Sequence, residues 1–295
     1  MIEFDWLMLF EVSLAGLGSG GLYALAGLAF VLIFKATKVV NLAIGEMLMM
    51  GAYFFFALAS SQGWPIWIGI LVAVVGNGLL GAVMERLFIR PMLGESPISV
   101  FMITIGISSI LVGTVELIWG ADQLRLPDFM PGDPVLIGEA MVPPKIFYGF
   151  LIATLLISSV LILFRFWRGG IALRATASDQ AAAYSMGINV PRVFSLAWVV
   201  GAMVAAVAGI IVGSISSLSP TMGVFGLSVL VVVIVGGLDS VAGALVGGIL
   251  VGLVEALSGT YLGGEFKMLA TFSLLVLILM VRPYGLFGTH EIERL

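Results

Sequence analysis

Long stretches without a single charged side chain are the feature that most restricts how this chain can fold. Two of them, Met47–Met84 and Val193–Leu238, exceed the roughly 20 apolar residues that a helix needs to cross about 30 Å of hydrocarbon. Across the 295 residues, 61% are hydrophobic and 10% are charged, whereas soluble proteins are about 25% charged. The apolar surplus is too large for a buried core, so we expect the chain to lie in a membrane.

The uncharged stretches predict an all-α polytopic membrane protein. Transmembrane β-barrels alternate polar and apolar residues along each strand, and these stretches do not. Turn-forming residues divide the two longest stretches, at Ser61–Pro65 and at Ser216–Pro220. The nine predicted spans are Val12–Phe34, the two halves of Met47–Met84, Ser96–Val115, Ile146–Phe164, the two halves of Val193–Leu238, Val241–Leu262 and Met268–Val281.

Lysine and arginine predict the orientation of these spans, because short loops rich in them stay cytoplasmic. Nine alternating spans put ten basic residues on one side: Lys35, Lys38, Arg86, Arg90, Arg165, Arg168, Arg174, Arg192, Arg282 and Arg294. The three on the other side are Arg125, Lys145 and Lys267. We therefore expect an external N-terminus and a cytoplasmic C-terminus. The acidic start, Met1–Asp5, lacks the positive charge of a secretory signal, so we expect the first span to be retained.

Missing residue types exclude several kinds of site. The chain has no Cys, and its one His is His290, which excludes thiolate metal sites, iron–sulfur clusters, disulfides and haem held by paired histidines. We expect neither a metal nor a cofactor. Scattered basic residues and a net charge of −4 give no surface for nucleic acid. No nucleophile or carboxylate pair converges at one depth, so we expect no catalytic residues and no enzyme.

Small residues recur at a spacing of four in two of the predicted spans. One set is Gly201, Ala205, Gly209 and Gly213, and the other is Gly243, Gly247, Gly248 and Gly252. Small residues let helix backbones approach closely in lipid, where no hydrophobic force brings helices together. We expect helix packing from them, with a solute path as the alternative.

Two loops are longer than a helix hairpin requires. The external loop, about 120–145, is acidic and rich in proline, so we expect an irregular connector or a docking surface for an external protein. The cytoplasmic loop, about 168–192, has an Ala-rich centre that favours a short helix of two to three turns. Ser178 or Asp179 is placed to cap its start, Gly187 to end it in the left-handed region, and Pro191 to prevent its continuation.

The cytoplasmic loop resembles the coupling loop of bacterial ABC importer permeases, in which Ala-Ala-x-x-x-Gly docks on the ATPase. Ala182, Ala183 and Gly187 fit that pattern, whereas Ala181 stands where many such permeases carry an acidic residue. A salt bridge from that acidic position is therefore not carried over. The resemblance assigns ATPase coupling to Gly170, Arg174, Ala175, Ala177, Asp179, Ala182, Ala183 and Gly187.

Three further stretches narrow the resemblance: Val40–Glu46 followed by Gly51–Tyr53, then Gly236–Ala244, then Arg282–Gly288. Together with the loop they resemble the permease subunit of the high-affinity branched-chain amino-acid importer, over about Gly16 to Gly288. This family implies one permease domain over residues 1–295, in the bacterial inner membrane. It implies a second homologous permease, two ABC ATPases and an extracytoplasmic binding protein as partners. Similar permeases serve urea and short amides, so the solute stays open, as does the choice between homodimer and heterodimer.

The chain carries no energy source that we can identify in its sequence. A phosphate-binding Gly-x-x-x-x-Gly-Lys-Ser/Thr loop needs Gly before Lys, but the four lysines follow Phe, Thr, Pro and Phe. ATP hydrolysis is therefore expected in partner subunits. The alternatives from other classes are an ion-coupled secondary transporter and a passive channel for small solutes. A docking loop distinguishes the importer from the channel, which has no use for one.

Acidic residues within the spans are the candidates for a solute path. Glu46 lies near Asn41 and Gly45, which indicate a broken or late-starting helix where backbone groups could meet a solute. The alternative is an ion pair of Glu46 with Lys35 or Lys38. Glu255 is the most deeply placed acidic residue of the later spans. No basic residue or His lies in the membrane to form a proton relay with these groups, which favours the ATP-driven reading over ion coupling.

Overall fold

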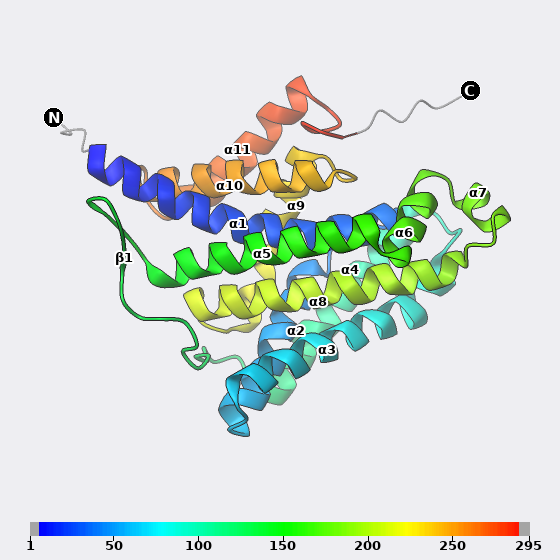
Figure 1. Cartoon of the computed structure of the whole chain (residues 1–295), viewed down its shortest axis with the longest axis horizontal. Coiled ribbons are helices and arrows are strands. Elements are labelled where there is room, and N and C mark those ends of the chain that lie inside the picture. The colour runs from blue at the N-terminus through cyan, green and yellow to red at the C-terminus, as the bar shows by residue number, and fades with distance from the viewer. Residues whose placement is uncertain (1–5, 289–295) are drawn as a thin grey trace. The chain divides into compact units, whose positions relative to one another are not determined.

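The structure is a computed structural model, and it describes residues 6–288. Three features of the sequence lie outside the described residues: the acidic start at Met1–Asp5, His290 and Arg294. The described chain is almost entirely helical, as the uncharged stretches predict, and one short antiparallel hairpin interrupts the helices (Figure 1).

The elements follow one another along the chain as α1 (Trp6–Thr37), α2 (Ile44–Phe56), η1 (Ala57–Ser61), α3 (Ile66–Met84), η2 (Glu85–Ile89), η3 (Arg90–Met92), α4 (Pro97–Trp119), β1 (Val135–Ile137), β2 (Ala140–Val142), α5 (Pro144–Phe166), α6 (Arg168–Ser178), α7 (Gln180–Ser185), α8 (Val190–Ser216), η4 (Pro220–Val224), α9 (Phe225–Gly236), α10 (Val241–Tyr261) and α11 (Phe266–Val281). The η elements are single turns of π-helix (η1, η2) or 3₁₀-helix (η3, η4).

Seven of the described helices are long and apolar enough to cross a membrane. Two further apolar helices, Pro220–Gly236 and Phe266–Val281, are shorter. The 16 residues of α11 span roughly 24 Å at 1.5 Å per residue, less than the full hydrocarbon thickness. A helix therefore stands at each of the nine predicted positions, and the two short ones are the positions where length alone does not establish a crossing.

The chain forms two compact units, each assembled from separate segments. Unit 1 comprises Met1–Gly27, Asp128–Thr154 and Ser228–Leu295. Unit 2 comprises Leu28–Pro127 and Leu155–Leu227. Helices α1, α5 and α9 each contribute residues to both units.

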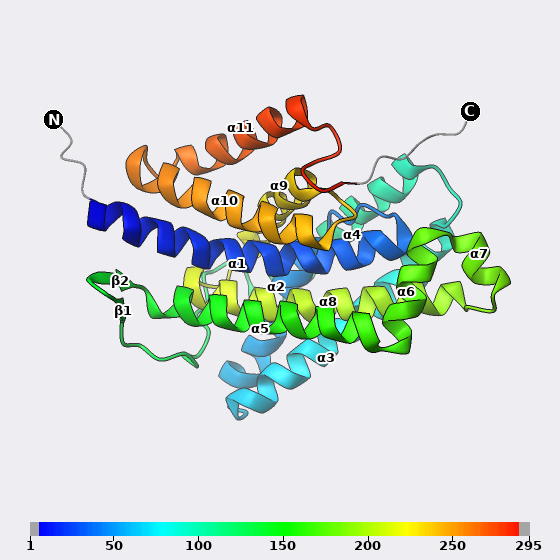
Figure 2. The same ribbon diagram turned by 45° about the horizontal axis from the view of Figure 1, so that its top comes forward.

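Within unit 1, α1 and α10 approach through small residues. A Cβ added to Gly252 would overlap the backbone of Gly20, and one added to Gly248 would lie 2.5 Å from the backbone nitrogen of Ala24. Figure 2 shows α10 running beside α1, with α11 on its other side. The packing role predicted for this set of glycines is confirmed.

Within unit 2, α2 packs against α3 and α8. The side chains of Met47, Leu48 and Tyr53 on this helix are fully buried. Gly209 of α8 lies against the backbone of Leu48, where a Cβ would overlap the carbonyl oxygen, and a Cβ on Gly51 of α2 would overlap Cα of Ala206. The small residues predicted to pack on α8 therefore include Gly209 at the interface with α2.

The loop between α4 and α5, which is predicted to be external and irregular, contains a short regular element. Its strands β1 and β2 pair in an antiparallel hairpin, and Gly138 between them has a φ of +67°. A hairpin of this kind needs a turn residue that tolerates positive φ. Each strand has three residues, too few to give the alternating pattern from which a strand is predicted.

Candidate functional site

The start of the loop at about 168–192, which is predicted to be cytoplasmic, is bound to the end of α5 by two predicted coupling residues. A Cβ on Gly170 would overlap the carbonyl oxygen of Phe164, so only glycine permits this approach. Arg174 donates from Nη1 to the same carbonyl at 2.6 Å and from Nη2 to the Arg165 carbonyl at 3.3 Å. The last carbonyls of a helix lack partners within it. Gly170 and Arg174 therefore hold α6 against α5.

The second part of the loop is α7, and both of its ends are fixed by side-chain or turn geometry. Asp179 caps the start by accepting a hydrogen bond from the Ala182 N–H at 2.9 Å. At the other end Gly187 has a φ of +83° and donates to the Tyr184 carbonyl, while Ile188 donates to the Ala183 carbonyl, both at 3.0 Å. These two bonds form a Schellman motif, which requires a left-handed residue. The predicted cap at Asp179 and the predicted left-handed helix end at Gly187 are confirmed.

The structure differs from the prediction of a single helix, because α6 precedes α7. Gly169 and Gly170 lower the helix propensity of this segment. The bond of Arg174 to α5 and the burial of Leu173 and Thr176 stabilise α6 instead. Figures 1 and 2 both show α6 and α7 at the end of unit 2 where α8 begins.

Two large side chains, one on α7 and one on the residue that follows it, are exposed. Tyr184 is 73% exposed and Met186 is 83% exposed. Ala182 is exposed beside them, whereas Ala183 is buried. The remaining predicted coupling residues, Ala175 and Ala177, are half-buried in α6.

The turn between α1 and α2 confirms a late-starting second helix. After Thr37 the chain leaves the helix at Lys38, whose φ is +57°, and α2 begins only at Ile44. Asn41 is buried, and its Oδ1 accepts a hydrogen bond from the Ala43 N–H at 3.0 Å. Asn41 therefore stabilises the turn that starts α2.

Gly45 and Glu46 in the first turn of α2 lie against η4 and the start of α9. A Cβ on Gly45 would lie 2.8 Å from the Gly226 backbone, and one on Gly223 would lie 2.8 Å from Oε1 of Glu46. Oε2 of Glu46 is buried and has no hydrogen-bond partner among residues 6–288. Among residues 6–288, no ion pair joins Glu46 to Lys35 or to Lys38. The ammonium group of Lys38 lies 5.7 Å from the centre of the Phe34 ring instead.

Glu255 of α10 accepts hydrogen bonds from three helices of unit 1. The Tyr23 hydroxyl donates to Oε2 at 2.5 Å, and the hydroxyls of Thr271 and Ser228 donate to Oε1 at 3.0 Å and 3.4 Å. These residues belong to α1, α11 and α9. Both oxygens of Glu255 are therefore already hydrogen-bonded within unit 1, in contrast to Oε2 of Glu46 in unit 2.

Sequence reasoning missed the uncharged polar residues that organise the interior of unit 2. Asn77 of α3 is fully buried and donates to the carbonyls of Met47 and Ala202 at 3.0 Å and 2.7 Å. Thr104 of α4 is also fully buried and accepts from the Leu42 N–H at 3.3 Å. A single polar residue in an otherwise apolar span was the signal that could have identified each of them. Their hydrogen-bond partners could not be predicted, because those partners are distant in sequence.

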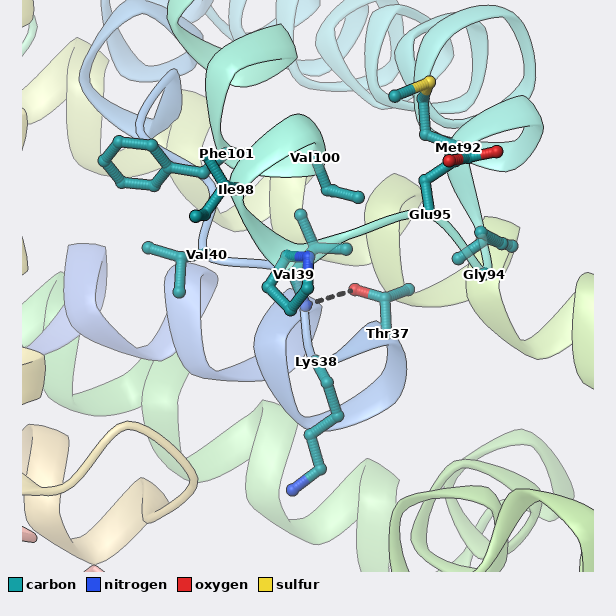
Figure 3. A pocket seen from close by; sticks show the side chains of 12 residues that line it. Thr37, Lys38, Val39, Val40, Met92, Gly94, Glu95, Ile98, Val100 and Phe101 are labelled. Atoms are coloured by element: carbon teal, nitrogen blue, oxygen red, sulfur yellow. Dashed lines mark hydrogen bonds between the residues drawn. The ribbon is translucent and has the colours of Figure 1, made fainter.

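A cavity of about 420 Å³ adjoins the turn between α1 and α2 (Figure 3). Apolar side chains from the turn and from the start of α4 line it, including Val39, Val40, Ile98 and Phe101. Figure 3 shows the ammonium end of Lys38 pointing away from these side chains. Thr104 lies one turn beyond Phe101 on α4, so the cavity approaches the turn that leads to Glu46.

Comparisons with known proteins agree with this arrangement. The E. coli (strain K12) high-affinity branched-chain amino acid transport system permease protein LivH is 31% identical over 95% of this chain and 95% of its own. The corresponding Pseudomonas aeruginosa protein, BraD, is 28% identical over the same shares. Among solved structures, PsaBC from Streptococcus pneumoniae in complex with Fab matches with a TM-score of 0.52 and 12% identity, covering 97% of this chain and 95% of that one.

The solved structure supports the fold alone, because its sequence identity is low. The family model described as "Branched-chain amino acid transport system / permease component" matches residues 12–281, nearly the whole described chain. The resemblance seen in the four sequence stretches is thereby confirmed. The chain belongs to the family of permease components of branched-chain amino acid transport systems.

Proposed function

We propose that this chain is the transmembrane permease subunit of an ATP-driven importer that moves branched-chain aliphatic amino acids across the bacterial inner membrane. The observation that carries the proposal is the α6–α7 loop. It is fixed to α5 by Gly170 and Arg174, it ends in a Gly187 Schellman motif, and it presents exposed apolar side chains. A rigid loop with an exposed apolar face suits docking of another protein. The family to which the chain belongs indicates the kind of transport system.

The proposed partners follow from what the chain lacks and what it presents. Since no lysine follows a glycine, the chain has no phosphate-binding loop, and two ABC ATPases would hydrolyse ATP. Ala182 and the neighbouring Tyr184 and Met186 would enter a groove on the ATPase. A second, homologous permease would complete the path, and an extracytoplasmic binding protein would deliver the solute.

Nine membrane crossings fit four contacts, each made within one unit. Glu11 of α1 accepts a hydrogen bond from the Met141 N–H of the external loop at 2.8 Å, and Leu124 pairs with Leu218 beyond α8. Arg90 after α3 reaches the Pro191 carbonyl at the start of α8, and Leu286 donates to the Val235 carbonyl at the end of α9. Each contact joins two segments that nine crossings place on the same side. The short helices α9 and α11 are therefore counted as crossings.

Glu46 is the residue that we place on the solute path, together with Asn41 and Gly45. Its Oε2 is buried without a partner, and helix starts of this kind expose backbone groups at membrane depth. Glu46 of unit 2 and Glu255 of unit 1 are both candidates for the solute path. Glu255 is already hydrogen-bonded by three hydroxyls, which favours a role in joining α1, α9, α10 and α11.

The experiment that tests the function measures nucleotide hydrolysis by the purified complex. The chain is expressed with the second permease and the ATPases made alongside it, and the complex is placed in nanodiscs. Leucine-loaded binding protein is expected to stimulate ATP hydrolysis, and leucine-free binding protein to stimulate it less. Stimulation by urea or acetamide but not leucine would identify the amide-importing alternative. Failure of this chain to co-purify with any ATPase would contradict the importer and favour an ion-coupled transporter or a channel.

A further inference from the structure

An ion pair between a buried carboxylate and a partly exposed guanidinium lies at the cytoplasmic end of α3. Glu85 begins η2, and its side chain is 1% exposed. Arg90 donates from Nε to Oε1 and from Nη2 to Oε2 of Glu85, both at 2.9 Å. Two parallel bonds of this kind fix the orientation of both side chains as well as their distance. A buried carboxylate that lost such a partner would be strongly unfavourable.

The same pair reaches across to the first turn of α8. The two N–H groups of Arg90 Nη2 are shared among Oε2 of Glu85, Ser195 Oγ at 2.7 Å and the Pro191 carbonyl at 3.1 Å. Ser195 Oγ in turn donates to Oε2 of Glu85 at 2.8 Å. The hydroxyl thus accepts from the guanidinium and donates to the carboxylate, which closes a ring of three side chains from η2, η3 and α8. All three residues lie within unit 2.

The helix that this ring holds is the direct continuation of the α6–α7 loop. Gly187 and Ile188 end α7, and Asn189 then caps α8 by accepting from the Arg192 N–H at 3.1 Å. No flexible linker separates α7 from the first turn of α8, where Arg90 hydrogen-bonds the Pro191 carbonyl. Further along α8, Gly209 packs on the backbone of Leu48, two residues after Glu46 on α2. A continuous series of contacts therefore runs from the loop to the helix of the proposed solute path.

We propose that Glu85, Arg90 and Ser195 form a joint that makes the α6–α7 loop, the start of α8 and the end of α3 move as one body. This inference rests on the proposed function, since it assigns the joint to the transfer of ATPase movement into the membrane helices. The three residues are positioning residues and touch no solute. Helices α3 and α8 are already packed along their length, with Asn77 bonded to the Ala202 carbonyl. The ring adds a directional link at the one end where α8 meets the loop.

The test removes the pair without leaving a buried charge. In the double variant Glu85→Gln/Arg90→Met the carboxylate and the guanidinium are lost together, which proteins tolerate better than loss of one partner. Arg86→Met is the control for loss of an arginine in this segment, because Arg86 is exposed in η2 and the substitution leaves the Glu85–Arg90 pair intact. Ser195→Ala is a milder variant that keeps the ion pair. Its control is Ser159→Ala, whose hydroxyl also bonds the carbonyl four residues earlier.

Leucine uptake and ATP hydrolysis are measured together in vesicles that contain the complete complex. For the double variant we expect normal co-purification with the ATPases, continued hydrolysis, and a loss of leucine transported per ATP of about tenfold, within the range of typical couplings between sites. Ser195→Ala should lose a smaller factor of about threefold by the same reasoning. Both controls should keep the wild-type ratio.

An unchanged ratio in the double variant, with the complex intact, would overturn the joint. If the double variant does not fold, the ratio in Ser195→Ala decides, and equality with Ser159→Ala would overturn the joint in the same way. Absence of ATP-driven leucine uptake in the wild-type complex would instead overturn the proposed function, and the joint with it. The two failures are therefore distinguishable, because only the second affects the unmodified protein.

Discussion

At the scale of single residues, the loop motif combines two different physical roles. Gly170 is buried and Arg174 is exposed, and both fix α6 to the last carbonyls of α5. Ala182 faces solvent, and Gly187 supplies a backbone conformation that other residues adopt only with strain. A motif that resembles one docking sequence therefore contains both residues that stabilise the loop and residues that are exposed on it.

Gly187→Val tests the scaffold of α7. A β-branched residue at a φ of +83° is strained by about 1–3 kcal/mol, which should unfold the end of α7. We expect much weaker co-purification with the ATPase and a nearly unchanged melting temperature of the membrane helices, because the loop lies outside them. Gly264→Val is the matched control, since Gly264 is a loop glycine with open space and no positive φ. Wild-type ATPase binding by Gly187→Val would refute the docking role of this turn.

Glu46→Gln tests the proposed solute path. The amide keeps the shape of the side chain but removes the charge whose Oε2 has no partner in the described chain. We expect the complex to assemble normally and leucine uptake to fall by about tenfold, the change that roughly 1.4 kcal/mol of lost interaction produces. Uptake is measured with the complete complex in vesicles. Unchanged uptake by Glu46→Gln would remove Glu46 from the path.

Sequence reasoning could identify residues whose partners are close along the chain. The Asp179 cap and the Gly187 turn depend on neighbours within four positions, so their roles were predictable. The hydroxyl partners of Glu255 were not, because Tyr23 lies 232 positions away and is brought near only by packing of α1 on α10. The Glu85–Arg90 pair is local, but its link to Ser195 spans 105 positions.

At the scale of elements, close helix contacts depend on residues without side chains. Gly209→Leu tests this for α8 and α2, because even a Cβ there would overlap the Leu48 carbonyl oxygen. We expect a destabilisation of at least about 1–3 kcal/mol, the usual effect of overpacking. It would be measured as a lower melting temperature in detergent and a lower folded yield. Gly113→Leu on α4 is the control, because no atom lies near its Cβ position. Equal stability of the two variants would contradict the described α2–α8 interface.

The sequence predicts the long helices well, since their apolar runs are longer than any soluble element requires. It does not predict the short elements in the loops. The strands β1 and β2 are too short for a periodic pattern, and α6 contains two glycines that disfavour helix. Both elements form because the chain around them holds them, as Arg174 does for α6.

At the scale of the whole molecule, the absence of cysteine makes the topology directly testable. Each introduced cysteine is a unique reporter in a chain with none of its own. Ser178→Cys, at the last residue of α6, should react with a membrane-impermeant maleimide only when the cytoplasmic side is open. Asp133→Cys, in the external loop, should react in intact cells. Labelling of both from the same side would contradict the nine crossings.

Uptake of leucine into vesicles is the most direct test of the central claim, that this permease works with ATPases rather than with an ion gradient. Vesicles would contain this chain, a second permease and two ATPases, with ATP and leucine-loaded binding protein each supplied on its proper side. We predict uptake only when both are present, no uptake by this chain alone, and a rate that an ionophore leaves nearly unchanged. Uptake by the isolated chain that follows an imposed ion gradient and ignores ATP would contradict the claim.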